Sequence, residues 1–388
     1  MTPAARTAAA IGLLDAWLAG APVERLLTTW GRQNRYAGAK DRAAIRDLVF
    51  DALRCRRSFA ALGGSATGRG LMLGLLRADG IAPGTIFTGE GHAPPPLTAA
   101  EQAVPPADLP EEIACDCPDA LAAVLHDSLG ADFLPIMQAL RHRAPVFLRA
   151  NLRRSTRDKA AAALAAEGIE TRPHPLSPTA LEVTANARRV QQSRTWREGL
   201  VELQDAASQT VADLMPLPEG GRVLDFCAGG GGKTLALAGR VSARFFAHDA
   251  APGRMRDLPA RAARAGVEVT LVAADDLAAA APFDLVLCDV PCTGSGAWRR
   301  SPEAKWRTGP DDLARLLAVQ AGILDRAAPL VAPGGALGYA TCSLIEAENG
   351  GQVAAFLSRQ PGWTRVAERR LTPLDGGDGF HAAVLRRN

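Results

Sequence analysis

Two cysteines close hydrophobic runs in the second half of the chain, and each stands beside a turn. Cys292 lies in LCDVPCTGSG (287–296), and Cys342 lies in GYATCS (338–343). Either thiol alone is most simply a small buried hydrophobic group. If the two runs are neighbouring parallel strands, however, both thiols lie at the sheet edge where such folds bind ligands. A pair of thiols in that place suits covalent chemistry on a pyrimidine ring.

That chemistry explains why two thiols are useful. C5 of cytosine is too electron-poor to attack a methyl group, but a thiolate that adds to C6 makes C5 nucleophilic. After C5 takes the methyl group, its proton must leave and the thiolate must be expelled, which a second acid–base group assists. Asp289, three residues before Cys292, could hydrogen-bond the N3/N4 edge of the base and stabilise developing charge. Cys288 lies inside its run and is expected in the core.

A glycine-rich turn follows the first hydrophobic run of this half, in VLDFCAGGGGKT (223–234). Glycines permit positive φ and let a ligand approach the backbone closely. A phosphate-binding P-loop is excluded, because Cys227 stands where its first glycine is required. A dinucleotide and S-adenosylmethionine both remain candidate ligands, since Asp249 closes the next run and suits the ribose hydroxyls of either. A purely structural turn is the third alternative, and the paired thiols favour S-adenosylmethionine.

Two further carboxylates, Asp275 and Asp276, close the third run. Either one could reach the adenine amino group of a bound nucleoside, and either could instead cap the helix that follows. The sequence leaves both roles open.

Hydrophobic runs alternate regularly with helical patterns from about Gly221 to the C-terminus. Runs rich in Val, Leu and Phe between helices are typical of a parallel sheet covered on both faces. We therefore expect a Rossmann-like α/β domain with a mostly parallel seven-stranded sheet over residues 201–388. Residues 141–200 are expected to form a small α+β segment, and residues 1–140 an all-α domain. A proline-rich stretch at 82–110 interrupts that first domain.

The helical prediction for the N-terminal part depends on apolar spacing. In KDRAAIRDLVFDALRC (40–55) the apolar residues recur at i, i+3, i+4, i+7 and i+8, which gives one apolar helix face. Asp41 is expected at the N-cap or in the first turn of this helix.

Charge is segregated along the chain, although the net charge is only +3. Residues 1–77 carry 12 basic and 5 acidic side chains, and residues 141–200 carry the same numbers. Residues 78–140 carry 10 acidic side chains and no Lys or Arg. Two basic blocks suit a surface that binds phosphates, and the block containing Arg153, Arg154 and Arg157 is expected to contact RNA. A solvated arginine-rich surface is the alternative.

Composition excludes several classes of protein. Seven cysteines scattered over 388 residues argue against a disulfide framework, and no Cys/His spacing suits zinc. We expect no metal. No uncharged apolar run approaches the ~18 residues of a membrane helix, and Asp15 interrupts the apolar N-terminal stretch, which argues against a signal peptide. We expect a soluble, cytoplasmic protein that does not bind a membrane.

The motifs together resemble those of RNA (cytosine-5) methyltransferases of the RsmB/Nop/Sun family. The resemblance is carried by LDFCAGGGGKT, FAHD, LCDVPCTGSGAWRRSPEAKW, YATCS, EAEN, QDAASQ (204–209) and DGFHAA (378–383), and it covers residues 145–388. The N-terminal helices, especially AGAKDRAAIRDLVFDALR, resemble the NusB-like RNA-binding domain of the bacterial ribosomal-RNA members.

This resemblance implies a role for each matching residue. Cys342 would be the nucleophile that attacks C6, and Cys292 would assist release of the methylated product. Asp289 would lie between the methionine end of the cofactor and the cytosine, and Lys233 would point towards the reacting centre.

The resemblance also implies S-adenosylmethionine as the cofactor. Asp249 would hold its ribose and Asp275 its adenine. The family turn usually has alanine and proline where this chain has Gly229 and Gly230, so the turn should be more flexible when empty. The residues expected to wrap the cofactor are Cys227, Ala228, Gly229, Gly230, Gly231, Gly232 and Lys233. The residues expected to contact RNA phosphates after the active-site strand are Arg299, Arg300 and Lys305.

We therefore expect a methyltransferase that modifies cytosine C5 in RNA, most simply ribosomal RNA. The same chemistry on transfer RNA is one alternative. A catalytically idle RNA-binding assembly factor is another, and the intact TCS and Pro-Cys motifs argue against it. An NAD-dependent dehydrogenase is the third. The sequence does not indicate an oligomeric state.

Overall fold

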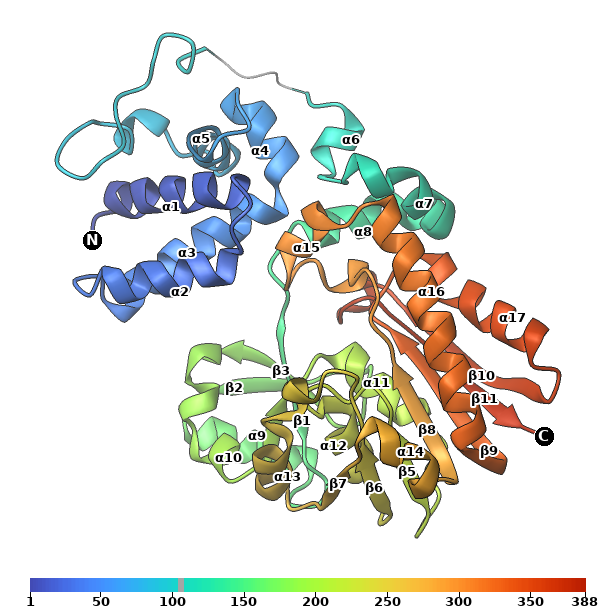
Figure 1. Ribbon diagram of the computed structural model, residues 1–388. Helices are drawn as coiled ribbons and strands as arrows, with labels where there is room; N and C mark the ends of the chain where they lie inside the picture. The colour runs from blue at the N-terminus through green and yellow to red at the C-terminus, as the bar shows by residue number, and fades with distance from the viewer. Residues whose placement is uncertain (104–107) are drawn as a thin grey trace. The chain divides into compact units, whose positions relative to one another are not determined.

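A computed structural model describes residues 1–103 and 108–388 (Figure 1). The part of the proline-rich stretch at residues 104–107 lies outside the described residues. The chain forms two compact units. The first comprises Met1–Ala123, Ala131–Arg143 and Trp298–Arg307, and the second comprises Val124–Gly130, Ala144–Ala297 and Thr308–Asn388.

The first unit is helical, as the sequence predicts for the N-terminal region. The expected apolar face of α3 is buried, with Ile45 and Leu53 packed in one hydrophobic cluster with residues of α1 and α5. Asp41 lies in the first turn of α3, where its side chain accepts a hydrogen bond from Gly38 N (3.3 Å). The helices are α1 (Pro3–Leu18), α2 (Val23–Gln33), α3 (Ala39–Arg54), α4 (Arg56–Gly63), α5 (Gly68–Ala78), α6 (Glu111–Ala114), the first part of α7 (Asp119–Leu129), α8 (Phe133–Leu140) and α15 (Pro302–Arg307).

One segment of this helical unit comes from the C-terminal half of the chain. Trp298–Arg307, which includes α15, belongs to the first unit although its flanking residues belong to the second. Glu303 Oε1 accepts hydrogen bonds from Trp17 Nε1 and Val23 N, both at 3.1 Å. The order of elements along the sequence did not predict this placement.

A small antiparallel sheet opens the second unit. It has four strands in the order β2-β3-β1-β4. The α+β composition of this region agrees with the segment that the sequence predicts, although the short strands β2 and β4 have no hydrophobic run of their own by which they could be predicted. The elements are β1 (Val146–Ala150), α9 (Arg157–Ala166), β2 (Glu170–Pro173), β3 (Ala180–Ala185), α10 (Arg194–Arg197) and β4 (Val201–Leu203).

A seven-stranded sheet forms the rest of the second unit, in the order β10-β11-β9-β8-β5-β6-β7. The strands β7, β6, β5, β8 and β9 are parallel, whereas β11 and β10 are antiparallel to their neighbours. The strands are β5 (Arg222–Asp225), β6 (Arg244–Ala247), β7 (Val269–Leu271), β8 (Phe283–Asp289), β9 (Val331–Thr341), β10 (Trp363–Leu371) and β11 (Phe380–Arg387). The helix before them is α11 (Ala206–Leu214), and the helices between them are α12 (Gly232–Ala238), α13 (Leu258–Ala265), α14 (Leu277–Ala280), α16 (Pro310–Ala327) and α17 (Gly350–Arg359).

Helices cover both faces of this sheet, which confirms the predicted fold class. Alternate residues of β8 enter different cores: Val286 and Cys288 pack with α16 and α17, whereas Leu285 and Leu287 pack with α11 and α12 (Figure 1). Cys288 is fully buried, as expected for a residue inside its strand. The chain runs from β5 outward to β6 and β7 and then returns to β8 on the other side of β5. The switch point therefore lies at the carboxyl ends of β5 and β8.

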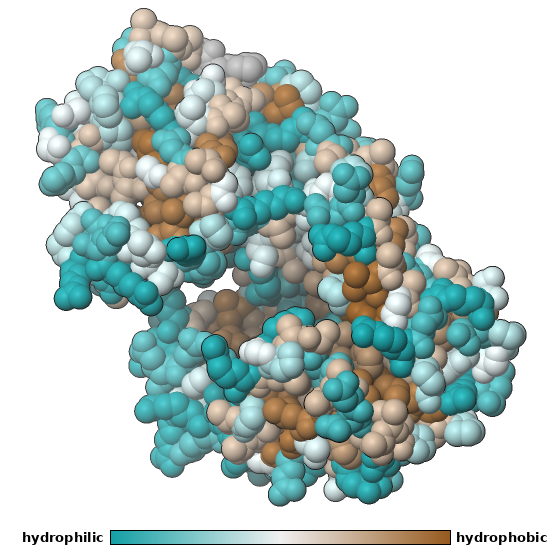
Figure 2. Space-filling model, viewed as in Figure 1, coloured by the Kyte–Doolittle hydropathy of each residue, from teal (hydrophilic) through white to brown (hydrophobic). Residues whose placement is uncertain are grey.

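One stretch, Asp119–Leu140, is long and apolar enough to cross a membrane by length and composition alone. It is not one continuous helix, because Gly130 (φ +54°) separates α7 from α8. Ile136, Met137 and Leu140 of α8 are buried, as in the core helix of a globular unit. Figure 2 shows hydrophilic residues over much of the visible face of each unit, with hydrophobic residues in smaller groups between them.

Candidate active site

A pocket of about 450 Å³ lies at the carboxyl ends of β5, β8 and β9. Its volume is in the range of small-molecule sites, roughly 300–1,000 Å³. The glycine-rich turn, Lys233, Asp289 and both cysteines line it. The tertiary structure thus brings together groups that lie more than a hundred residues apart in the sequence, from Cys227 to Cys342. Six further lining residues were not among the predicted site residues: Gln204, Ser208, Arg254, Arg261, Val290 and Pro291.

The two thiols face each other across adjacent strands. Cys292 follows β8, Cys342 follows β9, and their Sγ atoms are 3.5 Å apart. The hydrogen bond to Cys342, together with burial, raises the pKa of Cys292 well above that of an ordinary thiol. Cys292 therefore keeps its proton readily. The alternative that each cysteine is simply a small buried hydrophobic group does not explain this arrangement, because both cysteines are half-buried on the wall of one pocket.

Lys233, which is buried, and Asp289, which is half-buried, form an ion pair beside the thiols. Lys233 Nζ donates to Asp289 Oδ2 at 2.7 Å and also lies 4.8 Å from the centre of the Phe380 ring. Burial lowers the pKa of Lys233, but the charge and hydrogen bond of Asp289 outweigh it, and Cys342 adds to the same effect, so the pKa is raised. Lys233 is a fixed cation within electrostatic reach of Cys342. Phe380, from the DGF motif, packs against it.

Two arginines donate hydrogen bonds to carbonyl oxygens of the glycine turn. Arg261 Nη1 donates to Gly230 O, and Arg149 Nη1 donates to Gly232 O at 2.8 Å. Gly229 (φ +50°) and Gly231 (φ +76°) adopt left-handed backbone conformations that favour glycine. These contacts restrain a turn that, from its glycines alone, is expected to be flexible when empty. No local pattern could have identified these arginines, because they come from α13 and β1.

Asp249 is also tied to this turn. Its Oδ2 atom accepts a hydrogen bond from Gly229 N at 2.9 Å and lies 3.2 Å from Arg254 Nη1. Asp249 is 2% exposed and does not line the pocket, because the turn and Arg254 cover its carboxylate. Asp275 lies in a 3₁₀ turn, is exposed and does not line the pocket. Its proposed contact with adenine therefore has no support from the pocket lining.

The capping role considered for the aspartate pair is not seen. Asp276 is the N-cap residue of α14, but no side-chain hydrogen bond caps that helix or the 3₁₀ turn before it. Both carboxylates are exposed.

The basic block of the small α+β segment has structural contacts of its own. Arg153 and Arg154 are exposed, and Arg157 is half-buried. Arg153 Nε donates to Ala238 O (2.6 Å) at the end of α12, and Arg157 lies 3.8 Å from Asp158. Contact of this block with RNA stays a prediction, and two of its three arginines already make contacts within the protein.

The basic residues after the Pro-Cys motif correct one expectation. Lys305 is 1% exposed and donates from Nζ to Arg54 O at 3.3 Å, and Arg299 is 6% exposed. Buried in the helical unit, these two side chains do not present charge to RNA phosphates in this structure. Arg300 is exposed, so it alone of the three keeps the placement that such a contact requires. The sequence pattern of a basic run could not reveal burial by residues far away in the chain.

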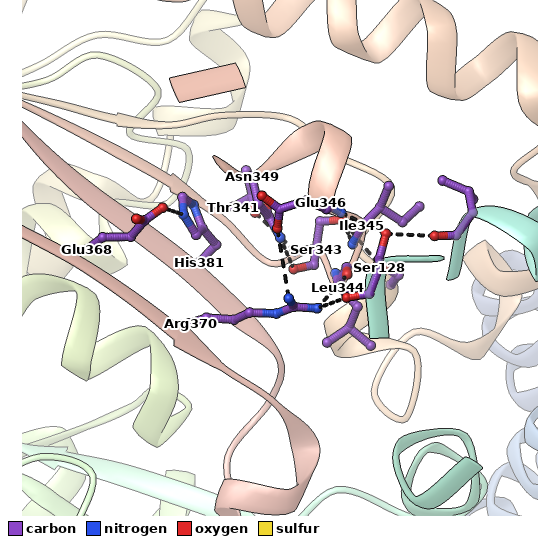
Figure 3. A network of polar contacts seen from close by, with 12 residues as sticks. Ser128, Thr341, Ser343, Leu344, Ile345, Glu346, Asn349, Glu368, Arg370 and His381 are labelled. Atoms are coloured by element: carbon purple, nitrogen blue, oxygen red, sulfur yellow. Dashed lines mark hydrogen bonds and ion pairs between the residues drawn. The ribbon is translucent and has the colours of Figure 1, made fainter. Parts of the chain in front are cut away.

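A polar network fixes the loop that follows Cys342 (Figure 3). Arg370 Nη2 donates to Ser128 O at 2.6 Å, and Glu346 N donates to Ser128 Oγ at 2.9 Å. On the same sheet, His381 Nε2 lies 2.8 Å from Glu368 Oε1. Burial lowers the pKa of His381 despite this carboxylate. These contacts attach the loop to α7 and β10.

Comparison with known protein families gives two matches. Residues 212–384 match the family described as 16S rRNA methyltransferase RsmB/F, and residues 117–191 match the ferredoxin-like domain of RsmF/B-like methyltransferases. Both matches begin at or after residue 117, so the resemblance of the N-terminal helices to a NusB-like domain stays a prediction.

Individual related proteins and solved structures agree with these family matches. The ribosomal RNA small subunit methyltransferase B of Salmonella arizonae is 33% identical over 282 residues, which cover 69% of this chain and 66% of that protein. The chain thus spans just under two thirds of the length of this relative. The crystal structure of PH0851 superposes with a TM-score of 0.78 at 21% identity, over 100% of this chain and 99% of that one. A methyltransferase homologue from Pyrococcus horikoshii has a TM-score of 0.64 at 23% identity, over 72% of this chain and 98% of its own. At such identities the two structures establish the fold.

Proposed function

Because this chain belongs to the RsmB/F family of 16S rRNA methyltransferases, we propose that it methylates C5 of a cytosine in ribosomal RNA. The methyl donor is S-adenosylmethionine, and the reaction passes through a covalent bond between Cys342 and C6. One observation carries the proposal: the Sγ atoms of Cys292 and Cys342 lie 3.5 Å apart on the wall of the pocket formed by the glycine turn.

The pocket residues suit S-adenosylmethionine. A volume of about 450 Å³ accommodates a nucleoside with an amino-acid tail, and the glycines let it approach the backbone. Asp249, at the end of β6, would accept the ribose hydroxyls once Arg254 moves aside. Bound there, the cofactor supplies the electrophilic methyl group. We propose that its methionine end lies near Asp289.

Addition to the base comes first. The thiolate of Cys342 forms a bond to C6, and the electron pair of the C5=C6 bond moves towards C5 and the N3 side of the ring. Asp289, held by Lys233 at 2.7 Å, would accept a hydrogen bond from the N4 amino group, and the cation of Lys233 beside it would stabilise the negative charge that develops in the ring. C5 would then be nucleophilic enough to take the methyl group that bound S-adenosylmethionine would supply beside Asp289.

Release of the product requires the second thiol. The C5 proton must be removed before the bond between Cys342 and C6 can break, and this elimination restores the C5=C6 bond. Cys292 is 3.5 Å from Cys342, so it would reach the same face of the ring. Its raised pKa keeps it protonated during the attack, which favours the order of steps in which Cys342 adds first. After giving its own proton to solvent, its thiolate would be a strong base for the C5 proton and would take up that proton as the bond between Cys342 and C6 breaks.

Ribosomal RNA is the substrate that the relatives favour. The names of the matching family and of the Salmonella relative both specify small-subunit ribosomal RNA. We propose that Arg153, Arg154, Arg157 and Arg300 contact its phosphates. A ribosomal substrate also implies action in the cytoplasm.

The two cysteines can be separated by trapping the covalent adduct. Cys342→Ala should neither methylate RNA nor form an adduct, because no thiolate adds to C6. Cys292→Ala should add and methylate but stall before elimination. With S-adenosylmethionine and small-subunit RNA, a protein–RNA species that resists denaturing electrophoresis should accumulate for Cys292→Ala alone.

Two results would contradict this assignment. An adduct with Cys342→Ala and none with Cys292→Ala would give the attack to Cys292. No adduct with either variant, nor with wild-type protein and 5-fluorocytosine RNA, would refute covalent catalysis, provided that calorimetry shows bound RNA and cofactor. Transfer RNA run in parallel tests the choice of substrate: methylation of transfer RNA alone would reject ribosomal RNA.

A further inference from the structure

A fully buried carboxylate lies behind the two thiols. Glu348, in the EAEN motif after Cys342, has no exposed surface. Its Oε2 atom accepts hydrogen bonds from Thr293 Oγ1 and Ser343 Oγ, both at 2.5 Å. Its Oε1 atom accepts from Thr293 N and Gln320 Nε2, both at 2.9 Å. Thr293 directly follows Cys292, and Ser343 directly follows Cys342. One side chain thus joins the residues next to both thiols.

The neighbouring asparagine holds Cys342 in a different way. Asn349 Oδ1 accepts from Thr341 Oγ1 at 2.5 Å, and Asn349 Nδ2 donates to Ser343 O at 3.0 Å (Figure 3). These bonds fix the residues on either side of Cys342 without involving the Cys292 loop. The residues that flank Cys342 are therefore held by both Asn349 and Glu348.

The Cys292 loop depends more heavily on Glu348. Both the backbone N–H and the hydroxyl of Thr293 donate to this carboxylate. Other hydrogen bonds also join the two loops, among them those from Gly296 N to Cys342 O (2.9 Å) and from Leu344 N to Ser295 Oγ (2.8 Å), but these two start three and four residues after Cys292. Before Cys292, Gln320 Nε2 donates to Pro291 O at 3.0 Å. Loss of Glu348 should therefore loosen Cys292 more than Cys342.

We propose that Glu348 is a positioning residue that sets Cys292 against the base held by Cys342. The inference rests on the proposed function, because it concerns the division of labour between the two thiols. An ionised carboxylate suits the task, since it accepts from four donors at once and charged hydrogen bonds are about twice as strong as neutral ones. A displacement of about 1 Å in a reacting group can cost on the order of 100-fold in rate. The step that suffers is elimination, not addition.

The test uses full-length Glu348→Gln. The amide keeps the size of the side chain, and the hydroxyls of Thr293 and Ser343 can turn to accept from its NH₂ group, so the fold should persist. The strong acceptor is lost, and Cys292 is no longer held in place. With S-adenosylmethionine and RNA, the denaturation-resistant adduct should rise at least about 10-fold above wild type, and turnover should fall by about 10–100-fold. Affinity for S-adenosylmethionine should stay within about twofold.

Two companion variants make the result specific. Thr293→Val removes the hydroxyl bond but keeps the backbone bond to Glu348, and should give the same adduct in smaller amount. Glu346→Gln is the matched control, because it is the same substitution two residues earlier on a side chain that is 53% exposed. It should give no adduct above wild type.

The outcomes distinguish this inference from the proposed function. Cys292→Ala must trap RNA, and if it does not, the covalent mechanism itself fails. If Cys292→Ala traps but Glu348→Gln and Thr293→Val do not, the positioning role is refuted. A Glu348→Gln protein that loses addition, elimination and cofactor binding together would also refute it, because Glu348 would then serve only the fold. If Glu348→Gln does not fold, Thr293→Val alone decides between these results.

Discussion

Asp225 lies beneath the glycine turn, and its burial disfavours the ionised form of its carboxyl group. It is 1% exposed at the end of β5. Its Oδ2 atom accepts a hydrogen bond from Thr234 Oγ1 at 2.6 Å, and among the described residues its Oδ1 atom has no partner. Burial raises the pKa of Asp225 from 3.8 to about 6, although the bond from Thr234 lowers it. At neutral pH the ionised group therefore costs stability.

The size of that cost follows from the shift. A rise of about two pKa units corresponds to about 3 kcal/mol, at ~1.4 kcal/mol per unit. The pKa of Asp225 is higher in the folded state than in the unfolded state, so the protonated carboxyl group favours the folded state. Its contribution to the free energy of unfolding is fully present below pH ~4 and is lost as the pH rises through about 6. Asp225→Asn has no charge at any pH and can still accept from Thr234. Its new NH₂ group has no acceptor, which costs about 1–2 kcal/mol.

We therefore expect Asp225→Asn to raise the free energy of unfolding at pH 7.5 by about 1–2 kcal/mol. The gain should shrink by about 1.4 kcal/mol between pH 7.5 and pH 5, as the wild-type carboxyl becomes protonated. Urea titration of both proteins at the two pH values measures this change. The free-energy cost of the unsatisfied amide is the same at both pH values, so it cancels from the change. Asp158→Asn is a control at a side chain that is 89% exposed, and it should show no such dependence.

A different outcome would refute the reasoning. If Asp225→Asn is destabilised equally at both pH values, the native state needs an ionised Asp225, and the unpaired Oδ1 atom must have a partner in solution. If the gain grows towards low pH, the sign of the pKa shift is wrong.

Two further predictions concern ligands. Asp249→Ala should weaken S-adenosylmethionine binding by about 10–100-fold, because the ribose loses a charged acceptor and Gly229 N loses its partner; calorimetry showing unchanged affinity would remove Asp249 from the site. Charge reversal of Arg153, Arg154 and Arg157 should weaken RNA binding and make its dependence on salt concentration less steep, in proportion to the number of phosphates that these arginines neutralise in the wild-type complex. Equal affinity and equal salt slope would make this block a solvated surface, and circular dichroism must first show that the fold stays intact without the hydrogen bond from Arg153 to α12.

Much of the fold could be predicted because local patterns of apolar residues in the sequence indicate it. The apolar stripe around Ile45 and Leu53 belongs to the buried face of α3, and Cys288 is in the core because it lies inside a strand. The alternation of hydrophobic runs and helices indicates a covered parallel sheet, since each run must bury both faces. Strands β2 and β4 escaped prediction because they are stabilised by pairing with β3 and β1, not by their own composition.

The sequence by itself determined which residues could do chemistry. The glycine turn, Asp289 and the two cysteines each follow a strand, and parallel strands must present their carboxyl ends at one edge. The meeting of these groups in one pocket is therefore a consequence of local pattern plus topology.

Only the tertiary structure decided how those groups are held. Glu348 bridges Thr293 and Ser343 across fifty residues of chain, and Arg149 and Arg261 grip the glycine turn from elements on either side of it in the sequence. It also decided that Lys305 is buried in the helical unit, where a basic run alone indicates exposure. Periodicity reports which face of an element is apolar, but hydrogen bonds between distant side chains depend on distances that only the assembled fold fixes.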